Sequence, residues 1–450
     1  MESISLQEIA EHLGTKAPVQ AEITEISTDT RNLPEGCLFI ALRGEKFDGH
    51  SFVHHAVTEG AVAAVTDTQM GDNPCLVVGN TGQALLDIAS FYRSKFDIPV
   101  VGITGSVGKT TTKEMTACVL SQRFKTLKTE ANLNNVIGCP KTLFGLTKEH
   151  GAAVIEMGMN HFGEISRMSR CTKPTMAVIT NIGYSHVENL GSQEGILKAK
   201  LEMLEGMNPH APLIVSGDDK LLAPLRDSLD GRLVYTFSTQ GNQADVNAED
   251  IKEENGVTTF TIVHGEKRLL AVLPAIGVHN VANALAAYLV GTLCGMEEQE
   301  ILCGIAEYRP TGNRQNITEK NGQTVIADCY NASPASMEAA LGVLAGYPCE
   351  GRRVAVLGDM LELGEMSDAL HEQVGKITAR SNLNMLYCYG TAAKHIAAKA
   401  GDRFGVFCTD DPSVLTEKLQ KYVKAGDVVL FKASHGMHLE RVIEAVYGAE

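Results

Sequence analysis

The residues Thr104-Gly105-Ser106-Val107-Gly108-Lys109-Thr110-Thr111 constrain the fold of this chain more than any other stretch. The apolar segment 98–103, rich in β-branched residues, precedes them and predicts a buried strand. The segment 113–120 that follows predicts a helix. A strand, a glycine-rich turn with Gly-Lys-Thr and a helix, in that order, are typical of a phosphate-binding loop.

The residue types of this loop suit a nucleoside triphosphate. Gly105 and Gly108 let backbone N–H groups close around phosphate oxygens, and the helix N-terminus adds partial positive charge. Lys109 would bridge the β- and γ-phosphates, and the Thr110 hydroxyl would ligate Mg²⁺. The usual pattern has glycine where this chain has Ile103, so a chance Gly-Lys-Thr in an ordinary strand–turn–helix is the alternative. The elements expected on both sides favour nucleotide binding.

Length and composition narrow the class of protein. A chain of 450 residues with 44% hydrophobic residues predicts two or three folded domains. Its net charge of −15 argues against broad binding to nucleic acids or membranes. We expect no signal peptide and no membrane span. The eleven cysteines are scattered, which is typical of reduced thiols in a cytoplasmic protein.

The first eighty residues predict a small α/β domain. Ser3 is expected to cap a short helix that ends at His12. Two unusually polar segments, 27–31 and 43–50, each follow an expected strand, which is where ligand-binding loops lie. From these residues alone a pair of ordinary surface turns is favoured. Strands are expected at 21–27, 37–41, 61–66 and 75–78.

Two polar residues follow strands expected in the middle of the chain. Glu156 ends the strand 152–155, where parallel sheets place their ligands and where a carboxylate suits Mg²⁺. His186 follows the strand 176–181 and could bind a metal, although a lone histidine is more often structural. A helix at 83–96, a strand at 212–216 and a hairpin of 257–263 with 267–273 complete the elements expected here.

Asparagines in two places could contact a nucleotide. Asn134 and Asn135 stand in a loop punctuated by glycine and could donate amides to phosphate, or could form a turn. Asn280 and Asn283 lie one turn apart on an expected helix. Carboxamides so placed can pair with an adenine edge, and helix capping is the alternative.

The rest of the chain alternates strands and helices after a linker at 308–314. This alternation predicts a second, Rossmann-like α/β domain, without the usual Gly-x-Gly-x-x-Gly turn. Its strands are expected at 324–327, 354–357, 385–389, 406–408 and 428–431.

Taken together, these residues resemble the Mur ligases, ATP-dependent amide-forming enzymes of peptidoglycan synthesis. The Thr-Gly-Ser-x-Gly-Lys-Thr-Thr loop is similar to this family's own phosphate-binding loop, which accounts for Ile103. The sequence Lys432-Ala433-Ser434-His435 departs from the family's commoner Lys-Gly-Ser-Arg. Four further segments resemble the member that adds a D-alanyl-D-alanine dipeptide: Phe47-Asp48-Gly49-His50, Asn134-Asn135-x-Ile137-Gly138, Tyr330-Asn331-Ala332-x-Pro334 and Leu357-Gly358-Asp359-Met360-x-Glu362-Leu363-Gly364.

The resemblance implies an α/β enzyme of three domains. Residues 1–82 would form a small α/β domain that binds UDP-N-acetylmuramoyl-tripeptide, and residues 83–310 a central P-loop domain that binds ATP. Residues 311–450 would form the Rossmann-like domain for D-alanyl-D-alanine and the adenosine. ATP would phosphorylate the terminal carboxylate of the tripeptide, and the dipeptide amine would attack the acyl phosphate. The resemblance further implies two Mg²⁺ ions and a monomer in the cytoplasm.

The resemblance also assigns residues to roles. Catalytic residues would be Lys109, His186, Lys200 and Arg314. Metal ligands would be Thr110, Glu156, His186 and a carbamylated Lys200. ATP would contact Thr104, Gly105, Ser106, Val107, Gly108, Lys109, Thr110, Thr111, Asn134, Asn135, Asn280, Asn283, Arg314 and Asp328. The other substrates would contact Ser27, Thr28, Arg31, Gly44, Asp48, Gly49, His50, Tyr330, Asn331, Lys432 and Ser434.

Lys200 is expected on the apolar face of a helix. Leu197, Leu201 and Leu204 recur at helical spacing, and Lys200 projects from this stripe whereas Lys198 projects toward its edge. Burial disfavours the ammonium, and a neutral amine can react with CO₂ to give a carbamate, an oxygen ligand for Mg²⁺. The helix pattern alone leaves a snorkelling lysine equally favoured. The spacing of fourteen residues from His186, which resembles that of the family, favours the carbamate.

Other members and another class share some of these features. The tripeptide synthetase of the same pathway and folylpolyglutamate synthase share the phosphate-binding loop and metal residues. The folate enzyme lacks a first domain of this kind, and the Tyr330-Asn331-Ala332 segment favours the dipeptide-adding enzyme over the tripeptide synthetase. A non-catalytic nucleotide-binding module would leave Glu156, His186 and Lys200 without a role. Whether the third residue of the peptide is diaminopimelate or lysine stays open.

Overall fold

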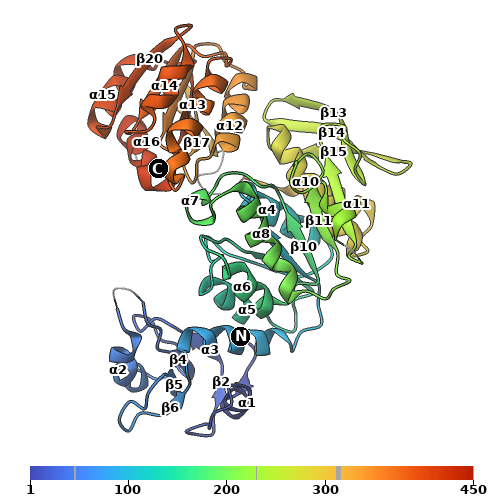
Figure 1. The fold of residues 1–450 in the computed structure, drawn as a ribbon, viewed down its shortest axis with the longest axis vertical. Coiled ribbons are helices and arrows are strands. Elements are labelled where there is room, and N and C mark those ends of the chain that lie inside the picture. Colours follow the sequence, from blue (N-terminus) through green and yellow to red (C-terminus); the bar gives the residue numbers. More distant parts are fainter. Residues whose placement is uncertain (45–46, 230, 311–315, 449–450) are drawn as a thin grey trace.

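A computed structural model describes residues 1–44, 47–229, 231–310 and 316–448. Among these residues the strands form four sheets. Three α/β units follow one another along the long axis of the molecule, blue, then teal to yellow-green, then orange to red (Figure 1). The α/β fold expected from the sequence is therefore confirmed.

The N-terminal unit is built on a parallel sheet with the strand order β3-β4-β5-β6. Ser5 caps the first helix by accepting a hydrogen bond from the backbone N of Gln7, whereas Ser3 donates to Glu22, so the cap expected at Ser3 is wrong by two residues. The strands are Ile4–Ser5 (β1), Glu22–Ile23 (β2), Glu25–Ser27 (β3), Cys37–Ile40 (β4), Ala63–Thr66 (β5) and Cys75–Val77 (β6), and the helices are Leu6–His12 (α1), Gly49–Phe52 (η1) and Val53–Thr58 (α2).

The middle unit contains a sheet with the order β15-β14-β13-β12-β11-β10-β7-β9-β8. Its strands pair in parallel from β13 to β8, and β14 and β15 extend it as an antiparallel hairpin. The strands are Val100–Thr104 (β7), Thr126–Lys128 (β8), Ala152–Glu156 (β9), Met176–Ile179 (β10), Leu213–Ser216 (β11), Val234–Ser238 (β12), Val246–Glu254 (β13), Val257–His264 (β14) and Lys267–Leu273 (β15).

Helices cover both faces of the parallel part of this sheet. Val101 and Ile103 pack with α4, α10 and α11 in one apolar layer, while Ala153 and Ile155 pack with α3, α5 and α6 in the other. Burial on both faces explains why these strands read as continuous apolar runs. The helices are Thr81–Arg93 (α3), Lys109–Leu120 (α4), Gly138–Phe144 (α5), Glu164–Thr172 (α6), Val187–Leu190 (α7), Gln193–Leu201 (α8), Glu202–Gly206 (η2), Leu225–Ser228 (α9), Val278–Leu293 (α10) and Glu298–Glu307 (α11).

The C-terminal unit contains a sheet with the order β16-β17-β21-β18-β19-β20. Among its described strands, β16 pairs antiparallel with β17, and the other neighbours pair in parallel. Helices α12, α13 and α14 cover one face, and α15 and α16 the other. The strands are Asn316–Lys320 (β16), Gln323–Asp328 (β17), Arg353–Gly358 (β18), Met385–Tyr389 (β19), Gly405–Thr409 (β20) and Val428–Lys432 (β21), and the helices are Pro334–Gly346 (α12), Gly364–Met366 (η3), Ser367–Thr378 (α13), Lys394–Ala400 (α14), Pro412–Tyr422 (α15), His435–Met437 (η4) and Leu439–Tyr447 (α16).

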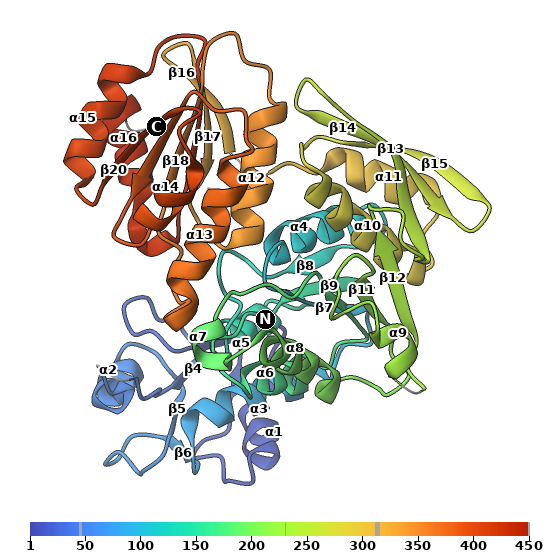
Figure 2. The same cartoon turned by 45° about the horizontal axis from the view of Figure 1, so that its top comes forward.

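Two contacts place the units relative to one another. The buried Tyr92 hydroxyl on α3 accepts a hydrogen bond from the backbone N of Glu2 and donates one to Leu146, both at 2.6 Å, which ties the N-terminus to the middle unit. The C-terminal unit stands over α4 and α7 (Figure 2), and η3 packs against α7. The boundaries expected at 82/83 and 310/311 stay a prediction, and residue 311 lies outside the described residues.

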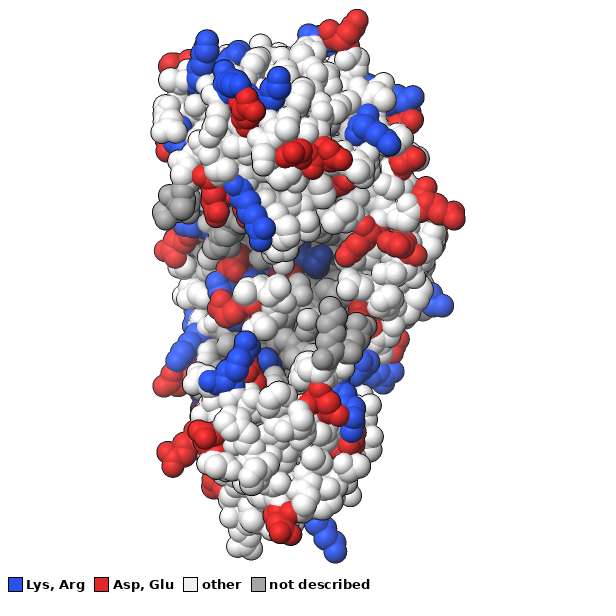
Figure 3. Space-filling model, turned by 90° about the vertical axis from the view of Figure 1, so that its left-hand side faces the viewer, with Lys and Arg blue, Asp and Glu red and all other residues white. Residues whose placement is uncertain are grey.

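The surface shows no broad basic area on the face drawn in Figure 3, where basic and acidic side chains are interspersed. None of the helices that the described residues form combines the length and the apolar character needed to cross a membrane.

Candidate nucleotide-binding and ligase site

The predicted phosphate-binding loop leaves β7 at Thr104 and enters α4 at Lys109. Gly105 has φ +154°, and a Cβ there would lie 1.8 Å from Oγ1 of Thr180. Gly108 has φ +84°, in the left-handed region. The loop therefore needs glycine at both positions, once for space and once for backbone conformation.

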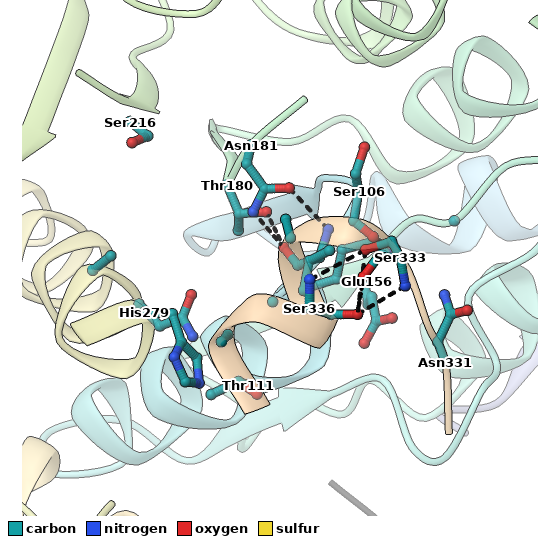
Figure 4. Close-up of a pocket in the computed structure, with 18 of the residues that line it drawn as sticks. Ser106, Thr111, Glu156, Thr180, Asn181, Ser216, His279, Asn331, Ser333 and Ser336 are labelled. Carbon is teal, nitrogen blue, oxygen red and sulfur yellow. Dashed lines mark hydrogen bonds between the residues drawn. The ribbon is translucent and has the colours of Figure 1, made fainter. Parts of the chain in front are cut away.

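Residues at the end of the neighbouring strand β10 hold this loop in shape. The Asn181 side chain accepts from the backbone N of Val107 and donates to its carbonyl, both at 2.9 Å, and Thr180 donates to the same carbonyl at 2.6 Å (Figure 4). The sequence analysis assigned neither residue a role. Their position directly after an expected strand, beside the strand that carries the loop, is the signal that could have found them.

The Lys109 side chain folds back over the loop. Its Nζ donates to the carbonyl of Gly105 at 2.9 Å and lies 3.4 Å from that of Ser106. The ammonium therefore lies against the backbone of the predicted phosphate-binding loop.

The predicted metal-binding carboxylate Glu156 ends β9 and is 1% exposed. Its Oε2 accepts from the Thr110 hydroxyl at 2.9 Å, and its Oε1 accepts from the Asn134 amide at 2.8 Å. A carboxylate and a hydroxyl at the start of a phosphate-binding helix are the donor set that suits Mg²⁺ shared with a nucleotide. Among the described residues, no group of three or more His, Cys, Asp or Glu side chains is arranged to hold a metal ion.

A second layer of buried groups supports Glu156. The backbone N of Glu156 donates to Oγ1 of Thr129 at 3.0 Å. The carbonyl of Thr129 accepts from Nζ of Lys113 at 2.6 Å, and this ammonium also lies 2.9 Å from the carboxylate of Glu114. Lys113 is 1% exposed and comes from α4, so it links the phosphate-binding helix to the strand that carries Glu156. Lys113 was not predicted from the sequence, because a lysine four residues after Lys109 gives no signal of burial.

Lys200 is buried, as expected, with a side chain that is 2% exposed. Burial, and then the nearby Lys109 charge, lower its pKa well below the usual value for lysine. Among the described residues no hydrogen bond or ion pair compensates its ammonium. Lys198 is exposed and lies over the ring of Phe162.

The apolar companions of Lys200 include those expected and others. Ile196, Ala199 and Met203 are the buried residues of this helix face, whereas Leu197, Leu201 and Leu204 are only half-buried. The three leucines still pack against the core, so the expected apolar stripe is present, and Ile196, Ala199 and Met203 are its more deeply buried neighbours.

His186 joins the middle unit to the C-terminal unit. It has φ +66°, and its Nδ1 lies 2.6 Å from Oε2 of Glu362. The contact with His186 holds the pKa of the Glu362 carboxyl below its usual value. Gly364 lies beside Glu188 of α7, where a Cβ would come within 3.2 Å of the Glu188 side chain. The loop after β18 thus docks on α7.

Asn280 and Asn283 share one buried face of α10, as expected. The side-chain Oδ1 of Asn283 accepts from the Thr112 hydroxyl at 3.0 Å, and its Nδ2 lies 3.5 Å from Oδ1 of Asn280. The Asn280 amide donates to the carbonyl of Ile276 at 2.7 Å. Both side chains also border the cavity described below.

Asp328 and Lys432 lie opposite one another on the paired strands β17 and β21. Nζ of Lys432 donates to Oδ2 of Asp328 at 2.7 Å and to the carbonyl of Asn331 at 2.9 Å. The Tyr330 ring lies 5.8 Å from that of His435.

A cavity of about 690 Å³ lies between the middle and the C-terminal units. Figure 4 shows Ser333 and Ser336 at the start of α12 on the same space as Glu156 and Asn181. Predicted residues that line it are Ser106, Val107, Gly108, Lys109, Thr111, Asn134, Asn135, Glu156, His186, Asn280, Asn283, Asp328, Tyr330, Asn331 and Lys432. Lining residues that were not predicted include Ser216, Asp218, Asp219, Phe237, Thr239, Gln240 and His279.

Comparison with known proteins identifies the family. The Mur ligase middle domain matches residues 103–291, the Mur ligase glutamate ligase domain matches 313–435, and the Mur ligase family catalytic domain matches 22–86. The chain belongs to the Mur ligase family.

Individual relatives cover almost the whole of this Mur ligase. It is 38% identical to the UDP-N-acetylmuramoyl-tripeptide–D-alanyl-D-alanine ligase of Bacillus subtilis, over 98% of this chain and 97% of that one. The crystal structure of MurF from Acinetobacter baumannii superposes with a TM-score of 0.92 at 32% identity and covers 99% of both chains. The MurF ligase of Thermotoga maritima, solved in complex with ADP, gives a TM-score of 0.85 at 29% identity, over 94% of this chain and 96% of that one.

Some predicted site residues lie away from the cavity of this Mur ligase. Ser434 is buried beside it and accepts from the backbone N of Leu361 at 2.9 Å. The cavity is not lined by Thr104, Gly105, Thr110 or Lys200, and Arg314 is outside the described residues. The N-terminal residues Ser27, Thr28, Arg31, Gly44, Asp48, Gly49 and His50 do not line it.

The N-terminal residues form a polar cluster of their own. Asp48 lies 2.6 Å from Nδ1 of the buried His50 and 2.5 Å from Arg43. Arg43 also pairs with Asp67 at 2.7 Å, and the backbone N of Asp67 donates to Nε2 of His50 at 3.1 Å. Arg31 stays outside this cluster and is 88% exposed. The sequence analysis did not select Arg43 as a site residue.

Proposed function

We infer that this chain is the ATP-dependent ligase that joins D-alanyl-D-alanine to UDP-N-acetylmuramoyl-tripeptide, a step of peptidoglycan precursor synthesis. The observation that carries this inference is the cavity in which a phosphate-binding loop, a buried carboxylate and the C-terminal unit meet. The relatives of the same length bear this activity in their names, and one structural neighbour holds ADP.

The geometry supports acyl-phosphate chemistry. A carboxylate is a poor acyl donor, so ATP transfers its γ-phosphoryl group to the terminal carboxylate of the tripeptide and leaves as ADP. The dipeptide amine then attacks the acyl carbon, and phosphate departs with the electrons of the broken C–O bond while the amine loses its proton. Phosphoryl transfer needs alignment and charge neutralisation more than a protein nucleophile. Lys109 and the N-terminus of α4 supply positive charge at the loop.

The oxygen donors that follow the C-terminal ends of β7 and β9 suit Mg²⁺. Thr110 and Glu156 would hold one ion together with phosphate oxygens, and His186 would contribute to a second. The ions would neutralise developing negative charge when bound. The Glu156 carboxylate keeps its position through the hydrogen bonds from Thr110, Asn134 and its own backbone N.

We propose that the Lys200 amine is carbamylated. An uncompensated buried ammonium next to Lys109 is unfavourable, and burial keeps the amine neutral and nucleophilic. Its reaction with CO₂ forms an N–C bond and releases one proton. The resulting carboxylate would pair with the Lys109 charge and supply oxygen to the metal site.

The remaining site residues divide among the three ligands in this proposal. In this proposal, residues 1–82 form the domain for the tripeptide nucleotide, residues 83–310 the ATP-binding domain and residues 311–450 the Rossmann-like domain. Asn280, Asn283 and Asp328 would bind the adenosine, with Arg314 on the phosphates. The N-terminal cluster around Asp48 and His50 would bind the UDP-muramoyl part. Tyr330, Asn331, Lys432 and Ser434 would face the dipeptide. We place this enzyme in the cytoplasm as a monomer, in keeping with eleven cysteines that are all unpaired.

The purified protein tests the inference directly. UDP-N-acetylmuramoyl-pentapeptide, ADP and phosphate are expected only when ATP, Mg²⁺, the tripeptide nucleotide and D-alanyl-D-alanine are all present. Running the assay with the diaminopimelate and the lysine tripeptides decides which is the substrate. Equal product with glutamate in place of the dipeptide would overturn the assignment.

A further inference from the structure

Two cysteines are partners across neighbouring strands of the C-terminal sheet, and neither of them lines the cavity described above. Cys388 on β19 and Cys408 on β20 are register partners in a parallel pair. The residues just before them, Tyr387 and Phe407, are also register partners, and their rings lie 6.0 Å apart on the opposite face. Partnered side chains on these two strands therefore share a face.

The spacing of the strands allows the two sulfur atoms to bond. Neighbouring strands stand about 4.8 Å apart. Disulfides bridge Cα atoms that are about 4.4 to 6.8 Å apart. Cys388 and Cys408 thus meet the distance requirement through backbone pairing alone. Both carry free thiols in this structure.

The two cysteines differ in access to solvent. Strand β20 is the edge of the sheet, and Cys408 is exposed there, whereas Cys388 is 0% exposed beneath α14. Among the eleven cysteines, all of which lie in the described residues, Cys408 alone is exposed. Interaction with the Cys388 thiol lowers the pKa of Cys408, and interaction with Cys408, together with burial, raises the pKa of Cys388. A reagent in solution therefore meets the exposed Cys408 first and the buried Cys388 second.

We propose that Cys408 and Cys388 form a thiol–disulfide exchange site, in which Cys408 reacts with a small disulfide and Cys388 converts the adduct into a cross-strand disulfide. The Cys408 thiolate attacks one sulfur of the small disulfide and releases one thiolate. The Cys388 thiol then loses its proton and attacks the Cys408 sulfur, which releases the second thiolate. Two protein thiols are oxidised, and one small disulfide is reduced to two small thiols. In a reducing compartment such a bond is reversible.

Oxidised glutathione is the probe for the test, applied to the folded full-length protein at neutral pH. Unreduced tryptic digestion should yield a linked pair of peptides, residues 381–394 joined to residues 404–418, each of which contains one cysteine. Cys388→Ala should instead accumulate a stable glutathione adduct on Cys408. Cys408→Ser should leave Cys388 unmodified.

Other cysteines of the chain serve as matched controls. Cys139 and Cys171 also lie close together, but both are buried and burial raises the pKa of each thiol, so they should stay reduced. Cys303→Ser, at a half-buried thiol on α11, should react like the unmodified protein. Glutathione spread evenly over the half-buried cysteines would overturn the proposal. A stable adduct on Cys408 in the unsubstituted protein, without the linked peptides, would also overturn it.

Discussion

The proposed chemistry makes its most specific prediction for Lys200. Lys200→Ala removes the buried amine and should lower kcat by at least about 100-fold, because the metal site loses an oxygen ligand. Acetate should restore part of the activity by filling the vacated position. Lys198→Ala is the matched control on the same helix, since Lys198 is exposed, and it should stay active. Full activity in Lys200→Ala, or loss in Lys198→Ala alone, would contradict the carbamate.

Substitution of Lys109 should also lower the activity strongly. Lys109→Ala should lower kcat by about 100- to 1000-fold, since the ammonium acts on charge that develops during phosphoryl transfer. The thermal unfolding midpoint should change little, because the carbonyls that accept from Lys109 belong to a loop whose shape Thr180 and Asn181 also hold. Lys141→Ala, at an exposed position on α5, is the control. A near-normal kcat would mean that the loop does not bind the transferred phosphate.

Lys113 should affect the metal site indirectly, through Thr129 and Glu156. Lys113→Met keeps the volume but removes the donor to Thr129, whose hydroxyl supports Glu156. We expect a higher Mg²⁺ concentration for half-maximal rate and a stability loss of about 1 to 3 kcal/mol from the unsatisfied carbonyl. Titration of Mg²⁺ together with chemical unfolding separates the two effects. A loss of stability with an unchanged Mg²⁺ dependence would show that Lys113 is only structural.

Among single residues, positions were predicted best from the sequence where a motif requires a particular residue type for a particular backbone conformation. Gly105, Gly108 and Glu156 stand where the loop and the strand end require them. Lys113 and Asn181 were missed, because their roles depend on neighbours brought in by the fold. No local pattern distinguishes a buried bridging lysine from an exposed one.

At the level of elements, strands with an apolar run or a clear turn signal beside them were predicted, including the half-exposed hairpin of β14 and β15, and strands without such a signal were not. The apolar runs of β7, β9 and β10 are buried on both faces and give a clear signal. Strand β13 escaped prediction because its second half, Asp250 to Glu254, is charged, and a register shift between Glu249 and Lys252 breaks the alternation.

The docking of the loop after β18 on α7 is a contact between elements that a substitution can weaken. Glu362→Gln keeps the shape of the side chain but removes the charge that faces His186 at 2.6 Å. We expect the C-terminal unit to separate more readily from the middle unit, which a pair of fluorophores on the two units would report as a longer mean distance. Glu365→Gln, in the adjacent η3 helix, is the matched control. Unchanged distances in both variants would show that the ion pair does not hold the units together.

For the whole molecule, the placement of the site between units predicts a change of shape on binding. The cavity takes its lining from the middle and C-terminal units, whereas the polar cluster around Asp48 and His50 lies on the N-terminal unit. In the proposed function, the tripeptide nucleotide extends from this cluster to the cavity, and the dipeptide binds at the C-terminal unit. The linker predicted at 308–314, which lies partly outside the described residues, connects two of these units.

Ligands that contact several units at once should favour a closed arrangement. A non-hydrolysable ATP analogue, the tripeptide nucleotide and D-alanyl-D-alanine added together should reduce the radius of gyration measured by small-angle X-ray scattering. Each ligand alone should reduce it less, because each one alone bridges fewer units. Lys109→Ala with the same ligands provides the control, since weaker phosphate binding should leave more of the population open. Identical scattering with and without the three ligands would show that the site is already assembled and that catalysis needs no domain movement.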